Sequence, residues 1–100
     1  MCKNCNPKTV FSGYTPPPPR VALMAWVNEQ GRSYYAEIVD ADGETHIAWV
    51  NVPGHHYRHT VPFTALESVA LCEGNTVIEA FGRPYIGKKA PAWVAFAEAV

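Results

Sequence analysis

Apolar and polar residues alternate in short segments along the middle of the chain, and turn-forming residues separate these segments. In the clearest segment, Tyr34, Ala36 and Ile38 fall on one face of an extended chain, and the residues between them fall on the other. A period of two is typical of a β-strand that has one buried face. The hydrophobic pattern predicts strands over residues 21–27, 33–39, 45–52, 60–63 and 76–81.

The segments between these strands carry residues that favour tight turns. A turn over residues 28–31 follows the first predicted strand, and Pro53-Gly54 ends the third. Asp42-Gly43, between the second and third strands, is the strongest hairpin signal in the chain, because an Asp-Gly pair suits a two-residue turn with positive φ angles. These turns predict an antiparallel meander or a small barrel.

Two segments have helical features. Thr64 to Glu67 predicts a single helical turn, with the Thr64 hydroxyl as its cap and Glu67 at the reciprocal capping position. Residues 91–100 predict a short C-terminal helix, because proline is tolerated in a first turn and alanine is the best helix former. The residues of this helix that fall at helical spacing, and that we expect to pack against the sheet, are Trp93, Phe96 and Val100.

The N-terminal segment differs from the rest of the chain. Residues 1–19 show no apolar periodicity and end in four consecutive prolines, Pro16 to Pro19. The fixed φ angle of proline favours an extended polyproline II segment, so we expect an extended arm. Two roles are open for the proline run: a stiff spacer that leads into the first strand, or a ligand for an aromatic groove on a partner.

Length and composition limit the architecture further. A chain of 100 residues suffices for one small domain, and 48% hydrophobic residues can supply its core. Nine prolines and seven glycines suit a turn-rich all-β domain better than a helical bundle. We therefore predict a mainly β protein: an arm over residues 1–19, then a single domain over residues 20–100, a small antiparallel β-barrel with a short C-terminal helix.

Charge and hydropathy argue against several classes of partner. Eight Lys and Arg residues nearly balance nine Asp and Glu residues, so nothing in the formal net charge of −1 favours nucleic acid or an anionic membrane. The longest apolar stretch, Val21 to Val27, is far below the roughly 20 residues that span a bilayer. The start of the chain has no secretory pattern. We expect a soluble intracellular protein, in the cytoplasm or within a virus particle.

The cysteines suggest one metal site. Cys2 and Cys5 have the two-residue spacing that can place two thiolates on one zinc ion. Further ligands would have to come from Cys72 or from histidines that are distant in sequence, and Cys72 itself is expected to be a buried thiol. The alternative is an N-terminal arm with two exposed thiols and no cofactor.

Three motifs follow one another between Met24 and Val69. A strand with Ala25-Trp26 leads into a turn and then into Tyr34-Tyr35-Ala36-Glu37-Ile38. The next strand is Ile47-Ala48-Trp49-Val50-Asn51-Val52-Pro53-Gly54, and Val61-Pro62-Phe63-Thr64-Ala65-Leu66 provides a closing strand and a short helical turn. In this layout the segment resembles the Tudor family of SH3-like small barrels. The resemblance implies an SH3-like (Tudor-like) antiparallel barrel over these residues.

The resemblance also implies a binding site. In that family, aromatic rings at one end of the barrel surround a methylated lysine or arginine, because a ring face attracts a weakly hydrated cation. Trp26, Tyr34 and Trp49 match the cage positions, and Asn51 is the nearby polar group. Val52 departs from the pattern, since the family often has a fourth aromatic residue there. The alternative is that Trp26 and Trp49 pair across adjacent strands and fill the core.

The segment after the third predicted strand is the most polar of the chain and runs from His55 to His59. Histidines can act as acid, base, metal ligand or pH-sensitive group near neutrality. The sequence offers no nucleophile in a recognisable motif and no group that orients these histidines, so we expect no enzyme. We expect the segment to form a loop beside the barrel mouth that contacts a partner.

From these features we predict a non-enzymatic protein-interaction module that binds a protein or peptide partner through an aromatic barrel mouth. The alternative is a virus-encoded structural or accessory protein, either a virion component or an inhibitor of a host protein, that docks through its arm and C-terminal helix. A homo-oligomer or a larger assembly fits either function. The predicted partner-binding residues are Trp26, Tyr34, Trp49, Asn51, His55, His56 and Tyr57.

Overall fold

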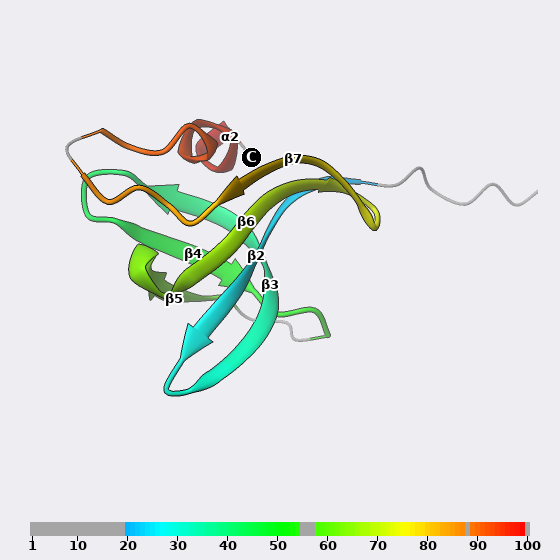
Figure 1. Cartoon of the computed structure of the whole chain (residues 1–100), viewed down its shortest axis with the longest axis horizontal. Helices are drawn as coiled ribbons and strands as arrows, with labels where there is room; N and C mark the ends of the chain where they lie inside the picture. The colour runs from blue at the N-terminus through cyan, green and yellow to red at the C-terminus, as the bar shows by residue number, and fades with distance from the viewer. Residues whose placement is uncertain (1–19, 55–57, 88, 100) are drawn as a thin grey trace, which may run out of the picture.

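The computed structural model describes residues 20–54, 58–87 and 89–99; the predicted arm and residues 55–57, 88 and 100 lie outside the described residues. In chain order the elements of the described residues are β2 (Val21–Glu29), β3 (Arg32–Asp42), β4 (Ile47–Asn51), β5 (Arg58–Pro62), the 3-10 helix η1 (Phe63–Ala65), β6 (Leu66–Glu73), β7 (Thr76–Gly82) and α2 (Trp93–Ala99). These six described strands form one antiparallel sheet in the order β5-β4-β3-β2-β6-β7 (Figure 1).

This architecture confirms a mainly β fold with an antiparallel sheet and one short C-terminal helix. The described strands do not close into a ring, because β5 and β7 are the two edges of the sheet. The first four strands form a meander from β2 to β5, and η1 then leads back to β6, which pairs with the other side of β2. The central strand β2 is therefore paired on one side with β3, which follows it directly, and on the other side with β6, which comes much later in the chain.

The β2–β3 hairpin follows directly from the sequence pattern. Leu23, Ala25 and Val27 alternate with more exposed residues along β2 and are almost fully buried. The turn consists of Gln30 and Gly31, with φ angles of 53° and 78°. Two successive positive φ angles match the right-handed twist of the flanking strands, as in a type I′ turn. The hairpin thus fixes a register in which each core-facing residue of β2 lies opposite one of β3.

The helix α2 completes the hydrophobic core. It packs mainly against β3, and Trp93, Val94 and Ala97 are its buried residues. The Trp93 ring contacts Phe63 of η1, with ring centroids 5.1 Å apart. The prediction of a core-facing tryptophan is confirmed, and Phe96 is half-buried against the same core. Neither α2 nor η1, the helices among the described residues, has the length and apolar character that a membrane crossing requires.

The prediction of a helical turn from Thr64 to Glu67 is wrong in position. The turn is η1, which Pro62 precedes without a side-chain cap, and Leu66 already begins β6. Ser68 has a φ of 54° and lies in a β-bulge opposite β2. The bulge adds one residue, so Leu66 and Val69, three apart, both point into the core. This spacing mimics a helix, and β6 was therefore missed in the sequence.

The Asp42-Gly43 hairpin is wider than the predicted two-residue turn. The His46 N–H donates to the Asp42 carbonyl at 2.9 Å, so the turn spans residues 43–46. The Glu44 N–H donates to Asp42 Oδ1 at 2.9 Å, and this hydrogen bond lowers the pKa of the Asp42 carboxyl. β4 consequently begins at Ile47, two residues later than predicted.

Candidate functional site

The aromatic residues predicted to form a cage lie on two sides of the sheet. In the β2–β3 register, Tyr34 pairs with Val27 and Trp26 pairs with Tyr35. Directly paired residues share a side, and neighbours along a strand alternate. Tyr34 therefore shares the core-facing side with the fully buried Val27, whereas Trp26 lies on the outer side and is 47% exposed. The structure does not bring Trp26 and Tyr34 together.

Trp49 also lies on the outer side, because its neighbour Val50 is fully buried in the core. Trp49 pairs with Asp40 of β3, five residues from Tyr35, the partner of Trp26. Five residues of a strand span roughly 16 Å. Because β3 lies between β2 and β4, the expected pairing of Trp26 with Trp49 across adjacent strands is wrong. Neither tryptophan belongs to the buried core.

The other predicted site residues are spread over the chain. Asn51 ends β4, on the same outer side as Trp49, and pairs with Glu37 of β3. Cys72 is buried on β6, and within residues 20–54, 58–87 and 89–99 no group of three or more His, Cys, Asp or Glu is placed to hold a metal ion. The predicted residues that lie outside the described part of the chain are Cys2, Cys5, His55, His56 and Tyr57.

A polar hollow lies where the β2–β3 turn meets the start of β5. Its volume is about 580 Å³, and Tyr34 is the predicted site residue that it contains. Val52 and His59, which precede and follow residues 55–57 in the sequence, take part in its lining. The lining residues are Glu29, Gln30, Arg32, Ser33, Tyr34, Val52 and His59.

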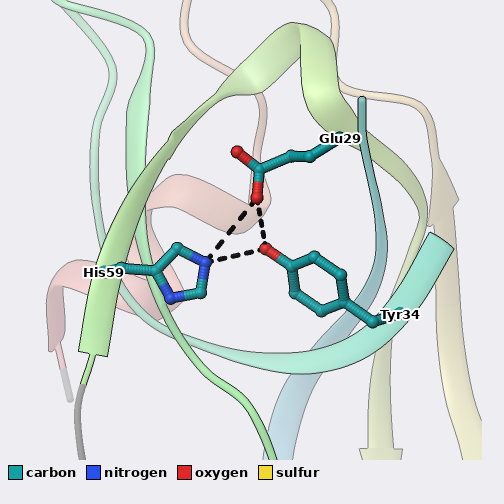
Figure 2. A network of polar contacts seen from close by, with 3 residues as sticks. All are labelled: Glu29, Tyr34 and His59. Carbon is teal, nitrogen blue, oxygen red and sulfur yellow. Dashed lines mark hydrogen bonds and ion pairs between the residues drawn. The ribbon is translucent and has the colours of Figure 1, made fainter. Parts of the chain in front are cut away.

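Three titratable side chains meet in the hollow (Figure 2). The Tyr34 hydroxyl donates to Glu29 Oε1 at 2.6 Å and lies 2.7 Å from His59 Nε2. A hydroxyl has a single proton, and here the carboxylate accepts it, so His59 donates from Nε2 to the Tyr34 oxygen. His59 Nε2 and Glu29 Oε1 are 3.7 Å apart, which adds an ion pair when the imidazole is protonated.

The fold brings these side chains together from three strands. Glu29 is the last residue of β2, and Tyr34 follows the two-residue turn on β3. His59 lies on β5 two residues before the buried Val61, so its ring faces the core side, as Tyr34 does. His59 pairs with Val50 of β4, and Tyr34 lies three residues before Glu37, the β3 partner of Asn51; their rings meet with centroids 5.9 Å apart.

Glu29 and His59 are not among the predicted partner-binding residues, and the structure places His59 on β5 rather than in the loop predicted from His55 to His59. The sequence contains a signal for one of the two. His59 stands at the period-two position of Val61, which indicates a core-facing side chain in a strand. Glu29 carried no such signal, because it was interpreted as part of a turn. Its role depends on the hairpin register, which places it beside Tyr34.

The exposed parts of the network define what it can bind. The side chains of Glu29 and His59 are 38% and 31% exposed, so a ligand in the hollow can reach both. A carboxylate is a strong acceptor for N–H groups that carry a positive charge. The hollow therefore offers one anionic acceptor beside the Tyr34 hydroxyl and the His59 ring, with Arg32 also in its lining.

We compared the chain with protein-family models, with curated proteins and with solved structures, and none of the three comparisons found a match.

Proposed function

We propose that this protein is a non-enzymatic interaction module and that the hollow around Glu29, Tyr34 and His59 receives a basic side chain of a protein or peptide partner. The observation that carries this proposal is the Glu29 carboxylate, which lies beside the Tyr34 hydroxyl at an open end of the sheet. A lysine or arginine of a partner gains a charge-assisted hydrogen bond from the carboxylate and a favourable contact with the ring faces.

The topology supports an SH3-like interpretation of the sheet. Strands β2 to β5 and the 3-10 helix η1 follow one another in the order of the motifs that carry the resemblance. The Tudor-like resemblance also implies a ligand site at one end of the strands. The hollow is at such an end, between the β2–β3 turn and the residues Val52 and His59.

The chemistry of the hollow favours an unmethylated cation. A cage for trimethyllysine needs several ring faces, and Trp26 and Trp49 lie on the other side of the sheet. The Glu29 carboxylate accepts hydrogen bonds from a ligand that has N–H donors, and trimethyllysine has none on its side-chain nitrogen. We therefore expect lysine and arginine to bind more tightly than trimethyllysine.

The test is a titration of the full chain with a set of peptides that differ only at a central residue: lysine, arginine, trimethyllysine or the uncharged norleucine. Amide chemical shifts in NMR spectra report the site, and calorimetry reports the affinity. We expect shifts at Glu29, Tyr34 and His59 with the lysine and arginine peptides. Tryptophan fluorescence is a poor reporter, because Trp26 and Trp49 are on the outer side.

Two variants and one matched control locate the contact. Glu29→Gln removes the charge and keeps the shape, and Tyr34→Phe removes the hydroxyl; each is expected to weaken binding about tenfold. Glu79→Gln, on the exposed strand β7, removes the same charge away from the hollow and is expected to leave the affinity unchanged. Equal binding of the norleucine peptide, or no shift in the hollow at millimolar peptide, would contradict the proposal.

A further inference from the structure

A second surface, on the outer side of the sheet, is independent of the hollow. We call it the outer groove; it has a volume of about 340 Å³ and lies over β2, β3, β6 and β7. Its character is mostly apolar, and it contains the exposed face of Trp26, which the hollow does not use. The residues that line it are Trp26, Tyr35, Ser68, Val69, Ala70, Cys72, Val77, Ala80 and Gly82.

Two aromatic rings form the floor of the outer groove. Trp26 and Tyr35 pack with centroids 5.2 Å apart and planes tilted by 47°, so together they present one bent aromatic surface. The Tyr35 hydroxyl lies 3.9 Å from the sulfur of the buried Cys72, which ties this ring to β6. Trp26, Tyr35 and Val77 remain 47%, 39% and 57% exposed. An apolar and exposed surface of this kind marks a contact site.

The chain itself contains a segment that matches this surface in chemistry. Pro16 to Pro19 end immediately before Arg20, the residue that precedes β2. Consecutive prolines favour the polyproline II conformation, which lies on aromatic surfaces at a low entropic cost because it is already ordered. The match is therefore between an apolar aromatic groove and a proline-rich ligand on the same polypeptide.

Charge favours the same pairing. Residues 1–19 contain Lys3 and Lys8 and no acidic residue, so their formal charge is +2. Because the whole chain has a formal net charge of −1, residues 20–100 carry −3. Glu67 lies on the outer side directly opposite Trp26 in the β2–β6 register, where its carboxylate accepts a hydrogen bond from Asn28. The basic arm and the acidic border of the groove attract each other.

The outer groove extends along β2 from Cys72, the register partner of Ala22, to Trp26, so only its Trp26 end is far from the prolines of the same chain. Trp26 lies six residues beyond Arg20 on β2, which is roughly 20 Å along the strand. The four prolines span about 12 Å at the polyproline II rise. Even after a complete reversal at Arg20 the run would end short of Trp26, so a contact between the run and Trp26 requires the proline run of another molecule.

We propose that the proline-rich arm of one copy, Pro16 to Pro19, binds the outer groove of a second copy over Trp26 and Tyr35. Reciprocal exchange of two arms gives a closed dimer with two identical contacts. The contact lies on the opposite side of the sheet from Tyr34, so the dimer leaves the hollow accessible.

The test is sedimentation velocity of the full chain over a range of concentrations up to about 1 mM, a range that covers weak dimers. The mean mass is expected to rise from 11.0 kDa toward twice this value. Trp26→Ala removes the groove's floor, and the double substitution Pro17→Gly with Pro18→Gly removes the stiffness of the arm. Each is expected to raise the dissociation constant of the dimer at least about tenfold. Tyr85→Ala, at an aromatic residue that is 68% exposed and outside the groove, is the matched control.

A mixture of the two variants distinguishes this proposal from general stickiness. The Trp26→Ala chain keeps an intact arm and the proline double variant keeps an intact groove, so the mixture is expected to form a dimer with one working contact. Circular dichroism confirms that both variants remain folded. A wild-type chain that stays monomeric up to the highest concentration overturns the proposal. So does dimerisation that neither variant weakens, or a concentration-independent change of Trp26 fluorescence in the proline variant, which would indicate binding within one chain.

Discussion

The indole of Trp93 is expected to be the largest single contributor to the packing of α2 on the sheet. Trp93 is 1% exposed and contacts Phe63 at a centroid distance of 5.1 Å. Substitution of a buried tryptophan by alanine costs about 3–5 kcal/mol in unfolding free energy, from lost burial and from the cavity that remains. Small domains have about 5–15 kcal/mol in total, so Trp93→Ala removes a large part of it.

A second variant tests the polar atom of the same side chain. Among the described residues, Trp93 Nε1 is buried and has no hydrogen-bond partner. A buried donor without an acceptor costs about 1–3 kcal/mol. Trp93→Phe removes that donor and keeps an aromatic ring, so the free energy gained by removing the unpaired N–H group offsets much of the free energy lost with the smaller ring. We expect Trp93→Phe to cost only about 0–2 kcal/mol.

Urea unfolding followed by circular dichroism measures both variants and does not depend on tryptophan emission. Trp26→Ala is the matched control, since it removes the same atoms from a side chain that is 47% exposed, and it is expected to cost less than about 1 kcal/mol. If Trp93→Ala costs no more than this control, α2 does not close the core. If Trp93→Phe is as destabilising as Trp93→Ala, Nε1 has a partner.

Three further predictions concern single residues. Ser68 has a φ of 54°, which β-branched residues adopt only with strain. Ser68→Val is therefore expected to destabilise the protein by about 1–2 kcal/mol although valine is the better strand former, whereas Ser68→Gly is expected to leave the stability unchanged or to raise it. Urea unfolding measures both variants. Tyr34→Phe removes two hydrogen bonds and is expected to cost about 1–2 kcal/mol in the same assay. The folded-state pKa of Asp42 lies below its ordinary value of 3.8, so its stabilising effect is present above pH 3.8 and is lost as the pH falls through the lower folded value. The melting temperatures of the wild type and Asp42→Asn are therefore expected to differ more at pH 7 than at pH 2.

The sequence predicted best those elements whose pattern depends only on local geometry. β2 and β3 alternate with a period of two and are joined by a turn that contains Gly31, so pattern and turn agree. The C-terminal helix was found from its composition, and Trp93 was expected in the core. In these segments each residue type suits the structure around it, and no distant contact is needed to explain it.

The sequence failed where a distant contact changes the local pattern. The bulge at Ser68 places Leu66 and Val69 on one side, and only the pairing of β6 with β2 reveals why. The aromatic site failed for a related reason. Trp26 and Tyr34 are close along the β2–β3 hairpin, but their register positions have opposite parity, so they face opposite sides. Aromatic content alone could not distinguish a cage from two separate surfaces.

Two neighbouring residues of β3 connect the two proposed surfaces. Tyr34 points into the hollow and Tyr35 into the outer groove, because consecutive residues of a strand face opposite sides. A partner in the hollow and a second copy on the groove would therefore contact the same strand without competing for the same atoms. Substitutions can separate the two contacts: Tyr34→Phe is expected to weaken peptide binding without affecting dimerisation, and Trp26→Ala is expected to have the opposite effect. A loss of both contacts in either variant would mean that the sheet transmits the change from one side to the other, and the two surfaces would then have to be treated as one coupled site.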